Sequence, residues 1–204
     1  MMNAVIYIHG KGGNAAEAEH YKSLFRDCDV IGIDYQSSLP WEAGKEIHNF
    51  VKELKSEYDR IILIANSIGA FFAMNADIEK DIFHAYFISP VTDMEKLITG
   101  MMAAAGVTET QLQEKGIIHT EFGEDLSWKY LCFVREHPVK WPVPTDILYG
   151  SEDKLISFDS ITAFAQACKS NLTVMNGGEH WFHTPEQMQF LDNWIKDNTV
   201  KGEI

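Results

Sequence analysis

Residues 61–70 read Ile61-Ile62-Leu63-Ile64-Ala65-Asn66-Ser67-Ile68-Gly69-Ala70, an apolar run that stops at a serine. Small residues stand two positions before Ser67 and two and three positions after it. A tight turn from a buried strand into a helix needs this pattern, because bulky side chains at Ala65 or Gly69 would collide with neighbouring elements. Such a turn lifts its serine out of the sheet, so Ser67 is a candidate nucleophile. On this stretch alone, a plain helix N-cap is an equal alternative.

Short apolar runs alternate with amphipathic stretches along the whole chain. Most of the runs are continuous, which is typical of strands covered on both faces of a parallel sheet. The predicted strands are 4–9, 30–35, 60–65, 85–89, 145–149 and 172–175, and the predicted helices are 14–26, 41–57, 68–78, 157–169 and 185–198. This alternation predicts one α/β domain over residues 1–204, with a mostly parallel sheet between two layers of helices.

One interval, residues 91–144, is too long for a single crossover helix. It carries Met101, Trp128 and Phe133 among other apolar side chains, and it closes with three prolines. Connections of this length in a compact domain are usually functional or mobile. We expect a helical insertion that acts as a cap or lid and lines an apolar pocket; ordinary helix packing is the alternative for each aromatic residue taken singly.

Composition narrows the function classes. The chain has 204 residues and a formal charge of −13, which disfavours nucleic acid, an anionic membrane surface or a strongly anionic substrate. Cys28, Cys132 and Cys168 have no metal-ligand spacing and are expected to be small core residues in a reducing compartment. No signal peptide or membrane span is evident. We expect a soluble cytoplasmic protein, a monomer or a simple homo-oligomer, that needs no metal or organic cofactor.

A glycine-rich loop follows the first predicted strand and reads His9-Gly10-Lys11-Gly12-Gly13. Such a loop can turn its backbone N–H groups toward a developing negative charge. A phosphate-binding loop is the alternative, but the spacing of the glycines matches neither of the common nucleotide-binding motifs.

Two further candidates follow the last two predicted strands. Asp153 lies three residues after Gly150, and His180 follows the pair Gly177-Gly178. Taken alone, each residue has a common structural explanation, such as an aspartate in a turn. However, parallel strands end at the same edge of a sheet, so Ser67, Asp153, His180 and the glycine-rich loop are expected to converge on one crevice.

The order serine, aspartate, histidine along the chain is that of the α/β-hydrolase triad. The chain resembles this superfamily over nearly its whole length, in the His9-Gly10 loop, the Ser67 elbow, Gly150-x-x-Asp153 and Gly178-x-His180. The elbow reads Ala-x-Ser-x-Gly, where the commoner form begins with glycine. The resemblance implies a minimal version of the fold without the leading antiparallel hairpin, with six strands in the order 2-1-3-4-5-6.

The same resemblance implies a mechanism. Ser67 would be the nucleophile, His180 its general base and Asp153 the acid that orients the imidazole. The backbone N–H groups of Lys11 and Ile68 would form the oxyanion hole. The expected pocket residues are Met101, Trp128, Phe133 and Trp181. The expected activity is that of a serine hydrolase (EC 3.1.1-like) that cleaves a small, apolar carboxylic ester through an acyl-enzyme.

Several alternatives remain open from the sequence. His183 could replace the proposed base, and Glu152 or Asp93 could replace the proposed acid. His9 is expected to shape the oxyanion loop rather than to carry protons. In place of an esterase, the chain could be a thioesterase, an acyl transferase or a catalytically inert binding module with the same fold, since a fold alone does not select a chemistry.

Overall fold

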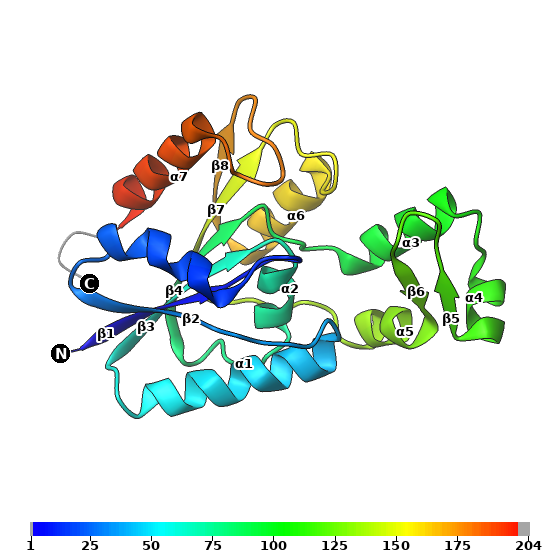
Figure 1. Ribbon diagram of the computed structural model, residues 1–204, viewed down its shortest axis with the longest axis horizontal. Coiled ribbons are helices and arrows are strands. Elements are labelled where there is room, and N and C mark those ends of the chain that lie inside the picture. The colour runs from blue at the N-terminus through cyan, green and yellow to red at the C-terminus, as the bar shows by residue number, and fades with distance from the viewer. Residues whose placement is uncertain (1, 200–204) are drawn as a thin grey trace. The chain divides into compact units, whose positions relative to one another are not determined.

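The computed structural model describes residues 2–199 of the chain, and its centre is a parallel six-stranded sheet (Figure 1). The strands are β1 (Asn3–Ile8), β2 (Cys28–Gly32), β3 (Arg60–Asn66), β4 (Ile82–Ile88), β7 (Thr145–Gly150) and β8 (Asn171–Met175). They lie in the order β2-β1-β3-β4-β7-β8, and every neighbouring pair is parallel. Counted among the six sheet strands alone, this is the predicted order 2-1-3-4-5-6, which is thereby confirmed.

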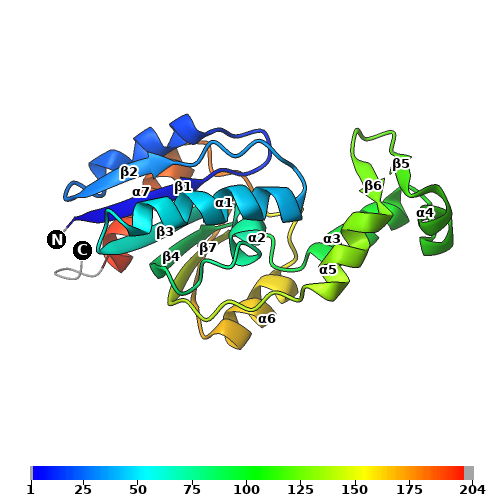
Figure 2. The same ribbon diagram turned by 90° about the horizontal axis from the view of Figure 1, so that it is seen from below.

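Helices cover both faces of the sheet. They are the 3₁₀ helix η1 (Ala15–Ser23) and the α-helices α1 (Pro40–Lys55), α2 (Ile68–Met74), α6 (Phe158–Cys168) and α7 (Pro185–Asn198). Figures 1 and 2 show η1 and α7 on one face, and α1, α2 and α6 on the other. Among residues 2–199, no helix combines the length and the apolar character that a membrane span requires.

The core is built from side chains that alternate between the two faces of the strands. Val5 and Tyr7 of β1 pack on the face covered by η1 and α7, together with Tyr21, Leu191 and Trp194 from those helices. Successive side chains of a strand point to opposite faces, so the alternate residues of β1, Ala4, Ile6 and Ile8, pack against the helices on the other face. They are buried as completely as Val5 and Tyr7. Burial on both faces explains the continuous apolar runs in the sequence.

Several predicted elements differ from those observed in their bounds. The strand expected at 85–89 is β4 (Ile82–Ile88), and the helix expected at 68–78 is α2 (Ile68–Met74). The helix expected at 14–26 is a 3₁₀ helix over Ala15–Ser23. The second strand, expected at 30–35, is β2 over Cys28–Gly32 and ends where Tyr7 pairs with Gly32. At Gly32 an added Cβ would lie 1.9 Å from the carbonyl oxygen of Ala15, so η1 lies directly against the end of this strand. The hydrophobic pattern extends further because Ile33 and Tyr35 remain buried beyond the last pair.

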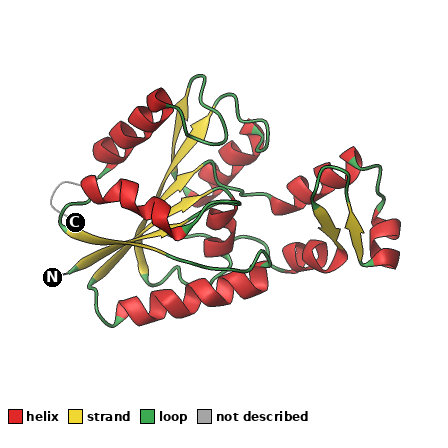
Figure 3. Cartoon of the chain, in the orientation of Figure 1, coloured by secondary structure: helices red, strands yellow, loops and turns green. Residues whose placement is uncertain are grey.

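The insertion forms a compact unit of its own over Asp93–Val139, within the predicted bounds of 91–144. It contains α3 (Met94–Ala104), α4 (Glu109–Lys115), α5 (Trp128–Glu136) and a hairpin of β5 (Ile117–His119) and β6 (Asp125–Ser127), which Figure 3 shows in yellow. Arg135 of α5 forms ion pairs with Glu95 of α3 and Glu109 of α4. The insertion is therefore helical, as expected, with one small antiparallel sheet in addition. Its action as a cap or lid stays a prediction.

Candidate active site

Ser67 stands at the turn between β3 and α2 in a backbone conformation that is rare for a serine. Its φ is 53° and its ψ is −121°. The turn is held by two backbone hydrogen bonds, from Ser67 N to the Ile88 carbonyl (3.0 Å) and from Val91 N to the Ser67 carbonyl (3.1 Å). The Ser67 side chain makes no capping hydrogen bond to α2, so the N-cap alternative does not describe it. A strained residue held in this way is a frequent feature of functional turns.

Small residues are required around Ser67 because β1 and its loop lie against the turn. An added Cβ at Gly69 would lie 2.4 Å from the carbonyl oxygen of His9 and 2.7 Å from that of Ile8. At Gly10 an added Cβ would lie 3.2 Å from the Cβ of Ser67. The glycine-rich loop and the serine turn are therefore in direct contact.

The loops that follow β7 and β8 approach each other just as closely. An added Cβ at Gly150 would lie 2.3 Å from the carbonyl oxygen of Gly178. Glu152 N donates a hydrogen bond of 2.8 Å to the same oxygen. This contact fixes the loop that carries Asp153 against the loop that carries His180.

Three side chains form a continuous hydrogen-bonded chain at this edge of the sheet. Ser67 Oγ lies 2.8 Å from His180 Nε2, and His180 Nδ1 lies 2.7 Å from Asp153 Oδ2. The Asp153 side chain is fully buried, whereas that of His180 is 23% exposed. An ionised carboxylate only accepts hydrogen bonds, so Nδ1 carries the proton of a neutral imidazole and Nε2 accepts from the Ser67 hydroxyl. The histidine is thereby held in the tautomer that can take a proton from the serine.

The second carboxylate oxygen of Asp153 also has partners. Asp153 Oδ1 accepts hydrogen bonds from Leu155 N (2.8 Å) and Ile156 N (2.9 Å). Both oxygens are thus satisfied, one by the protein backbone and one by the imidazole. This arrangement stabilises a buried carboxylate and fixes its orientation.

The three alternative residues have other contacts. His183 Nδ1 donates to the Trp181 carbonyl (2.7 Å), and the two rings stack with centroids 4.5 Å apart. Glu152 is exposed. Asp93 accepts a hydrogen bond from Lys96 N (2.9 Å) and caps α3. Ser67, Asp153 and His180 are the set that the structure brings together.

The backbone groups predicted for the oxyanion hole belong to segments that adjoin Ser67. Ile68 is the first residue of α2, so its N–H has no acceptor within the helix. Lys11 lies in a turn closed by the hydrogen bond from Gly13 N to the Gly10 carbonyl (3.1 Å). The part of these N–H groups in catalysis stays a prediction.

The His9 side chain contacts the glycine-rich loop and Tyr35. Its Nδ1 donates to the Gly10 carbonyl (2.8 Å), and its ring stacks on Tyr35 with centroids 4.3 Å apart. Tyr35 in turn donates a hydrogen bond of 2.8 Å to the His9 carbonyl. These contacts agree with a shaping role for His9.

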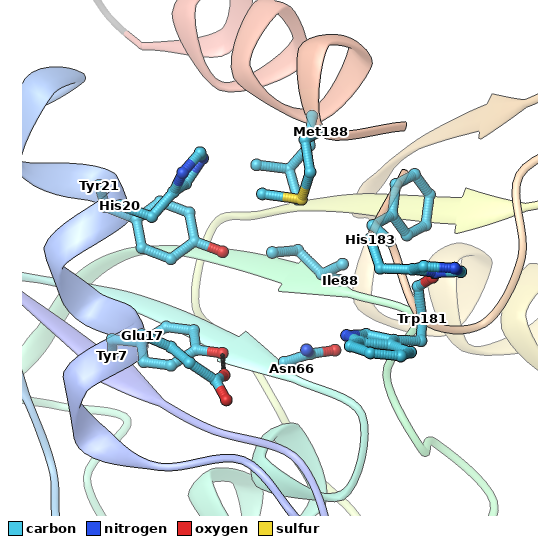
Figure 4. A pocket seen from close by; sticks show the side chains of 11 residues that line it. Tyr7, Glu17, His20, Tyr21, Asn66, Ile88, Trp181, His183 and Met188 are labelled. Atoms are coloured by element: carbon cyan, nitrogen blue, oxygen red, sulfur yellow. Dashed lines mark hydrogen bonds between the residues drawn. The ribbon is translucent and has the colours of Figure 1, made fainter. Parts of the chain in front are cut away.

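A pocket of about 370 Å³ lies beside the chain segments that carry Ser67 and His180, although none of the three hydrogen-bonded side chains lines it (Figure 4). Asn66 and Trp181 line it, and they are the chain neighbours of Ser67 and His180. The other lining residues come from β1, β4, η1, α7 and the loop before α7: Tyr7, Glu17, His20, Tyr21, Ile88, Phe182, His183, Met188 and Leu191. All eleven residues belong to the unit that contains the sheet.

The predicted pocket residues therefore divide into two groups. Trp181 lines the pocket, and 66% of its surface is exposed. Met101, Trp128 and Phe133 are partly buried residues of α3 and α5 in the insertion and do not line this pocket. Their contribution to substrate binding stays a prediction.

Sequence reasoning missed the contribution of η1 to the pocket. Glu17 has a visible local signal, since Asn14 and Glu17 form a capping box at the start of η1. That signal is purely structural and gives no hint of a pocket. The contact of Glu17 with Tyr7 of β1 depends on how η1 lies on the sheet. Within residues 2–199, no cluster of three or more His, Cys, Asp or Glu side chains could hold a metal ion.

Comparison with known proteins gives matches in structure but none in sequence. No protein-family model and no curated protein sequence matches the chain. The esterase Est1E from Butyrivibrio proteoclasticus superposes with a TM-score of 0.77 at 17% identity, over 96% of this chain and 86% of that one. Mouse alpha/beta hydrolase domain-containing protein 10 gives a TM-score of 0.72 at 17% identity, over 95% and 88% of the two chains. A lipase-esterase related protein from Clostridium acetobutylicum ATCC 824 gives 0.63 at 15% identity, over 96% and 93%.

Proposed function

The chain has the fold of the α/β hydrolases, and on this premise we propose that it is a serine hydrolase that cleaves carboxylic esters. The observation that carries the proposal is the hydrogen-bonded series from Ser67 through His180 to Asp153. A serine hydroxyl becomes an effective nucleophile when a base within hydrogen-bond reach accepts its proton. The tautomer that Asp153 imposes on His180 makes Nε2 that base.

The proposed reaction proceeds through an acyl-enzyme. Ser67 Oγ bonds to the acyl carbon while its proton passes to His180 Nε2, and the carbonyl oxygen becomes an oxyanion. The tetrahedral intermediate then expels the alcohol, which takes the proton from His180. Water attacks the acyl-enzyme with His180 again as base, and the carboxylic acid leaves as Ser67 regains its proton.

Three groups are proposed to stabilise charge during these steps. The Asp153 carboxylate stabilises the imidazolium that forms when His180 accepts the proton. The N–H groups of Lys11 and Ile68 are proposed to donate to the oxyanion, and loss of one such donor typically lowers kcat by about 10²–10³. Neither the formation nor the hydrolysis of the acyl-enzyme requires a metal ion or an organic cofactor in this mechanism.

The proposed substrate is a small ester with an apolar part. Ile88, Phe182, Met188 and Leu191 supply apolar surface to the pocket beside Ser67. One solved structure of Est1E, which shares the fold, has ferulic acid, an aromatic carboxylic acid, bound to it. Met101, Trp128 and Phe133 remain candidates for contacts from the insertion.

Covalent labelling tests the proposal directly. A fluorophosphonate probe, followed by peptide mass spectrometry, should place one adduct on Ser67. The adduct should be absent from Ser67→Ala and strongly reduced in His180→Ala. His48→Gln is the matched control, because His48 lies on α1 and contacts the Ala76 carbonyl outside the site.

Each result of this experiment decides something. Adduct formation on Ser67 in the wild type and the control, with ester hydrolysis that depends on the same residues, supports the hydrolase. Folded protein that neither reacts with the probe nor hydrolyses esters would instead favour a binding module. Transfer of the acyl group to added alcohols or thiols in preference to water would point to an acyl transferase.

A further inference from the structure

One end of the pocket beside Ser67 is polar and anionic. Tyr7 Oη donates a hydrogen bond of 2.6 Å to Glu17 Oε2, and Asn14 N donates one of 3.2 Å to Glu17 Oε1. These two bonds hold the carboxylate in a fixed orientation on the pocket wall (Figure 4). Each carboxylate oxygen accepts up to two hydrogen bonds, so Glu17 retains capacity for a ligand.

Tyr21 presents an unused hydroxyl to the same pocket. Its side chain is buried, with 5% of its surface exposed, and its ring packs on Tyr7 with centroids 5.3 Å apart. Among residues 2–199, no group forms a hydrogen bond with the Tyr21 hydroxyl, which points toward the pocket in Figure 4. The hydroxyl is not among the fully buried polar atoms that lack a partner, so it is accessible from the pocket and free to bind water or a ligand.

The charges around the pocket favour a cation. No lysine or arginine of residues 2–199 lines it. Each of the two histidines at its wall lies beside a carboxylate: His20 Nε2 is 2.7 Å from Asp192 Oδ1, and His183 Nδ1 is 3.8 Å from Glu179 Oε2. Burial, followed by the nearby Glu17 carboxylate, raises the pKa of Tyr21, so its hydroxyl stays neutral and able to accept a hydrogen bond.

We propose that this pocket binds the ammonium group of the substrate, with Glu17 as counter-ion and the Tyr21 hydroxyl as a second acceptor. An ammonium group carries three N–H donors, and the pocket wall offers it the Glu17 carboxylate and the Tyr21 hydroxyl as acceptors. No lysine or arginine among the lining residues competes with it for these acceptors. The exposed face of Trp181 adds a surface that attracts cations. The inference rests on the proposed function and specifies its substrate class: carboxylic esters in which the acid or the alcohol part bears a primary amine.

Binding measurements test this subsite without any turnover. Benzylammonium and benzyl alcohol have nearly the same size and differ in charge. Calorimetry with the whole protein should show that benzylammonium binds about tenfold more tightly than benzyl alcohol at low salt, and the difference should shrink as salt is added. Because no ester is cleaved, the result is independent of whether Ser67 is reactive.

Three variants assign the preference to residues. Glu17→Gln keeps an acceptor for Tyr7 and removes the charge, so the preference for benzylammonium should fall about five- to tenfold. Tyr21→Phe removes only the hydroxyl and should weaken benzylammonium binding several-fold. Glu17 and Glu19 are both exposed residues of η1, but Glu19 pairs with Lys22 and does not line the pocket. Glu19→Gln therefore makes the same charge change outside the pocket and should keep the wild-type preference.

The outcomes separate the two proposals. Equal affinity for both probes, or equal losses in Glu17→Gln and Glu19→Gln, would overturn the ammonium subsite, whatever the labelling of Ser67. Tighter binding of benzyl alcohol that depends on Tyr21 would overturn it in favour of a neutral hydroxyl ligand. The expected preference with no adduct on Ser67 would keep the subsite and overturn the hydrolase.

Discussion

Asp153 uses its two carboxylate oxygens for two different tasks. Oδ1 accepts from the backbone of its own loop, and Oδ2 accepts from His180. The first task orders the loop, and the second selects the imidazole tautomer. A substitution that keeps the loop ordered but changes the imidazole tautomer therefore isolates the contribution of Asp153 to catalysis from its contribution to loop structure.

Asp153→Asn is that substitution. Its amide oxygen can still accept from Leu155 N and Ile156 N, whereas its NH₂ group would face His180 Nδ1 as a donor. The imidazole would then carry its proton on Nε2 and could not accept from Ser67. We expect kcat/KM for ester hydrolysis to fall by about 10³–10⁴.

The control for this prediction is Asp159→Asn, at an exposed aspartate in the first turn of α6. Both variants should keep the far-UV circular dichroism of the wild type. If Asp153→Asn retains wild-type kcat/KM, Asp153 is not the acid of the proposed mechanism, and Glu152 and Asp93 become the residues to test.

At the scale of the elements, the active-site edge depends on close approaches that glycine permits. The turn between β3 and α2 touches the end of β1 at Gly69, and the loops after β7 and β8 touch at Gly150 and Gly178. In both places an added Cβ would meet backbone atoms, which cannot rotate away. These contacts hold the loops at the distances that the side-chain hydrogen bonds require.

Gly69→Ala should consequently destabilise the fold. The new Cβ would lie 2.4 Å from the His9 carbonyl oxygen, so β1 or α2 must shift. We expect the free energy of unfolding to fall by about 2–3 kcal/mol, as measured by chemical denaturation.

Gly100→Ala is the matched control within α3, because its added Cβ has no atom within 4 Å and the position is exposed. There the helix propensity of alanine should raise stability by about 0.5–1 kcal/mol. Equal effects of the two substitutions would contradict a close approach at Gly69.

At the scale of the whole molecule, buried tyrosines make the free energy of unfolding depend on pH in the alkaline range. Tyr7, Tyr21, Tyr35 and Tyr86 are each at most 7% exposed. Burial raises the pKa of each, to about 12 for Tyr86. The folded state therefore retains phenol protons that the unfolded chain releases near the ordinary pKa of about 10.

The sign of the effect follows from this difference. The contribution of these phenols to the free energy of unfolding is fully present below about pH 10. It is lost as the pH rises toward the pKa values of the folded state. We expect cooperative unfolding above about pH 11, in which tyrosinate absorbance and loss of helical circular dichroism coincide. Gradual tyrosinate formation near pH 10 in a protein that keeps its helical signal would contradict this prediction.

Tyr21→Phe provides the matched comparison, because it removes one buried titrating group that has no hydrogen-bond partner among residues 2–199. It should move the alkaline midpoint upward. A midpoint that moves downward would show that the hydroxyl stabilises the folded state by some other means.

Local sequence patterns determined the elements and the order of the candidate residues. The continuous apolar runs predicted the six sheet strands, because strands buried on both faces must be apolar throughout. The small residues around Ser67, the single glycine Gly150 before Asp153 and the glycine pair before His180 predicted tight turns at the strand ends. With the direction rule for parallel strands, this was enough to place all three side chains at one edge.

Tertiary structure alone decided which side chains meet. Whether His180 or His183 faces Ser67 depends on the loop after β8, and that loop is positioned by the backbone contact between Gly150 and Gly178. The polar end of the pocket arises where η1 lies on β1, so that Glu17 reaches Tyr7. Local patterns report which residues are buried or turn the chain, whereas contacts between distant segments depend on how the layers pack. For that reason the strands and turns could be read from the sequence, and the pocket could not.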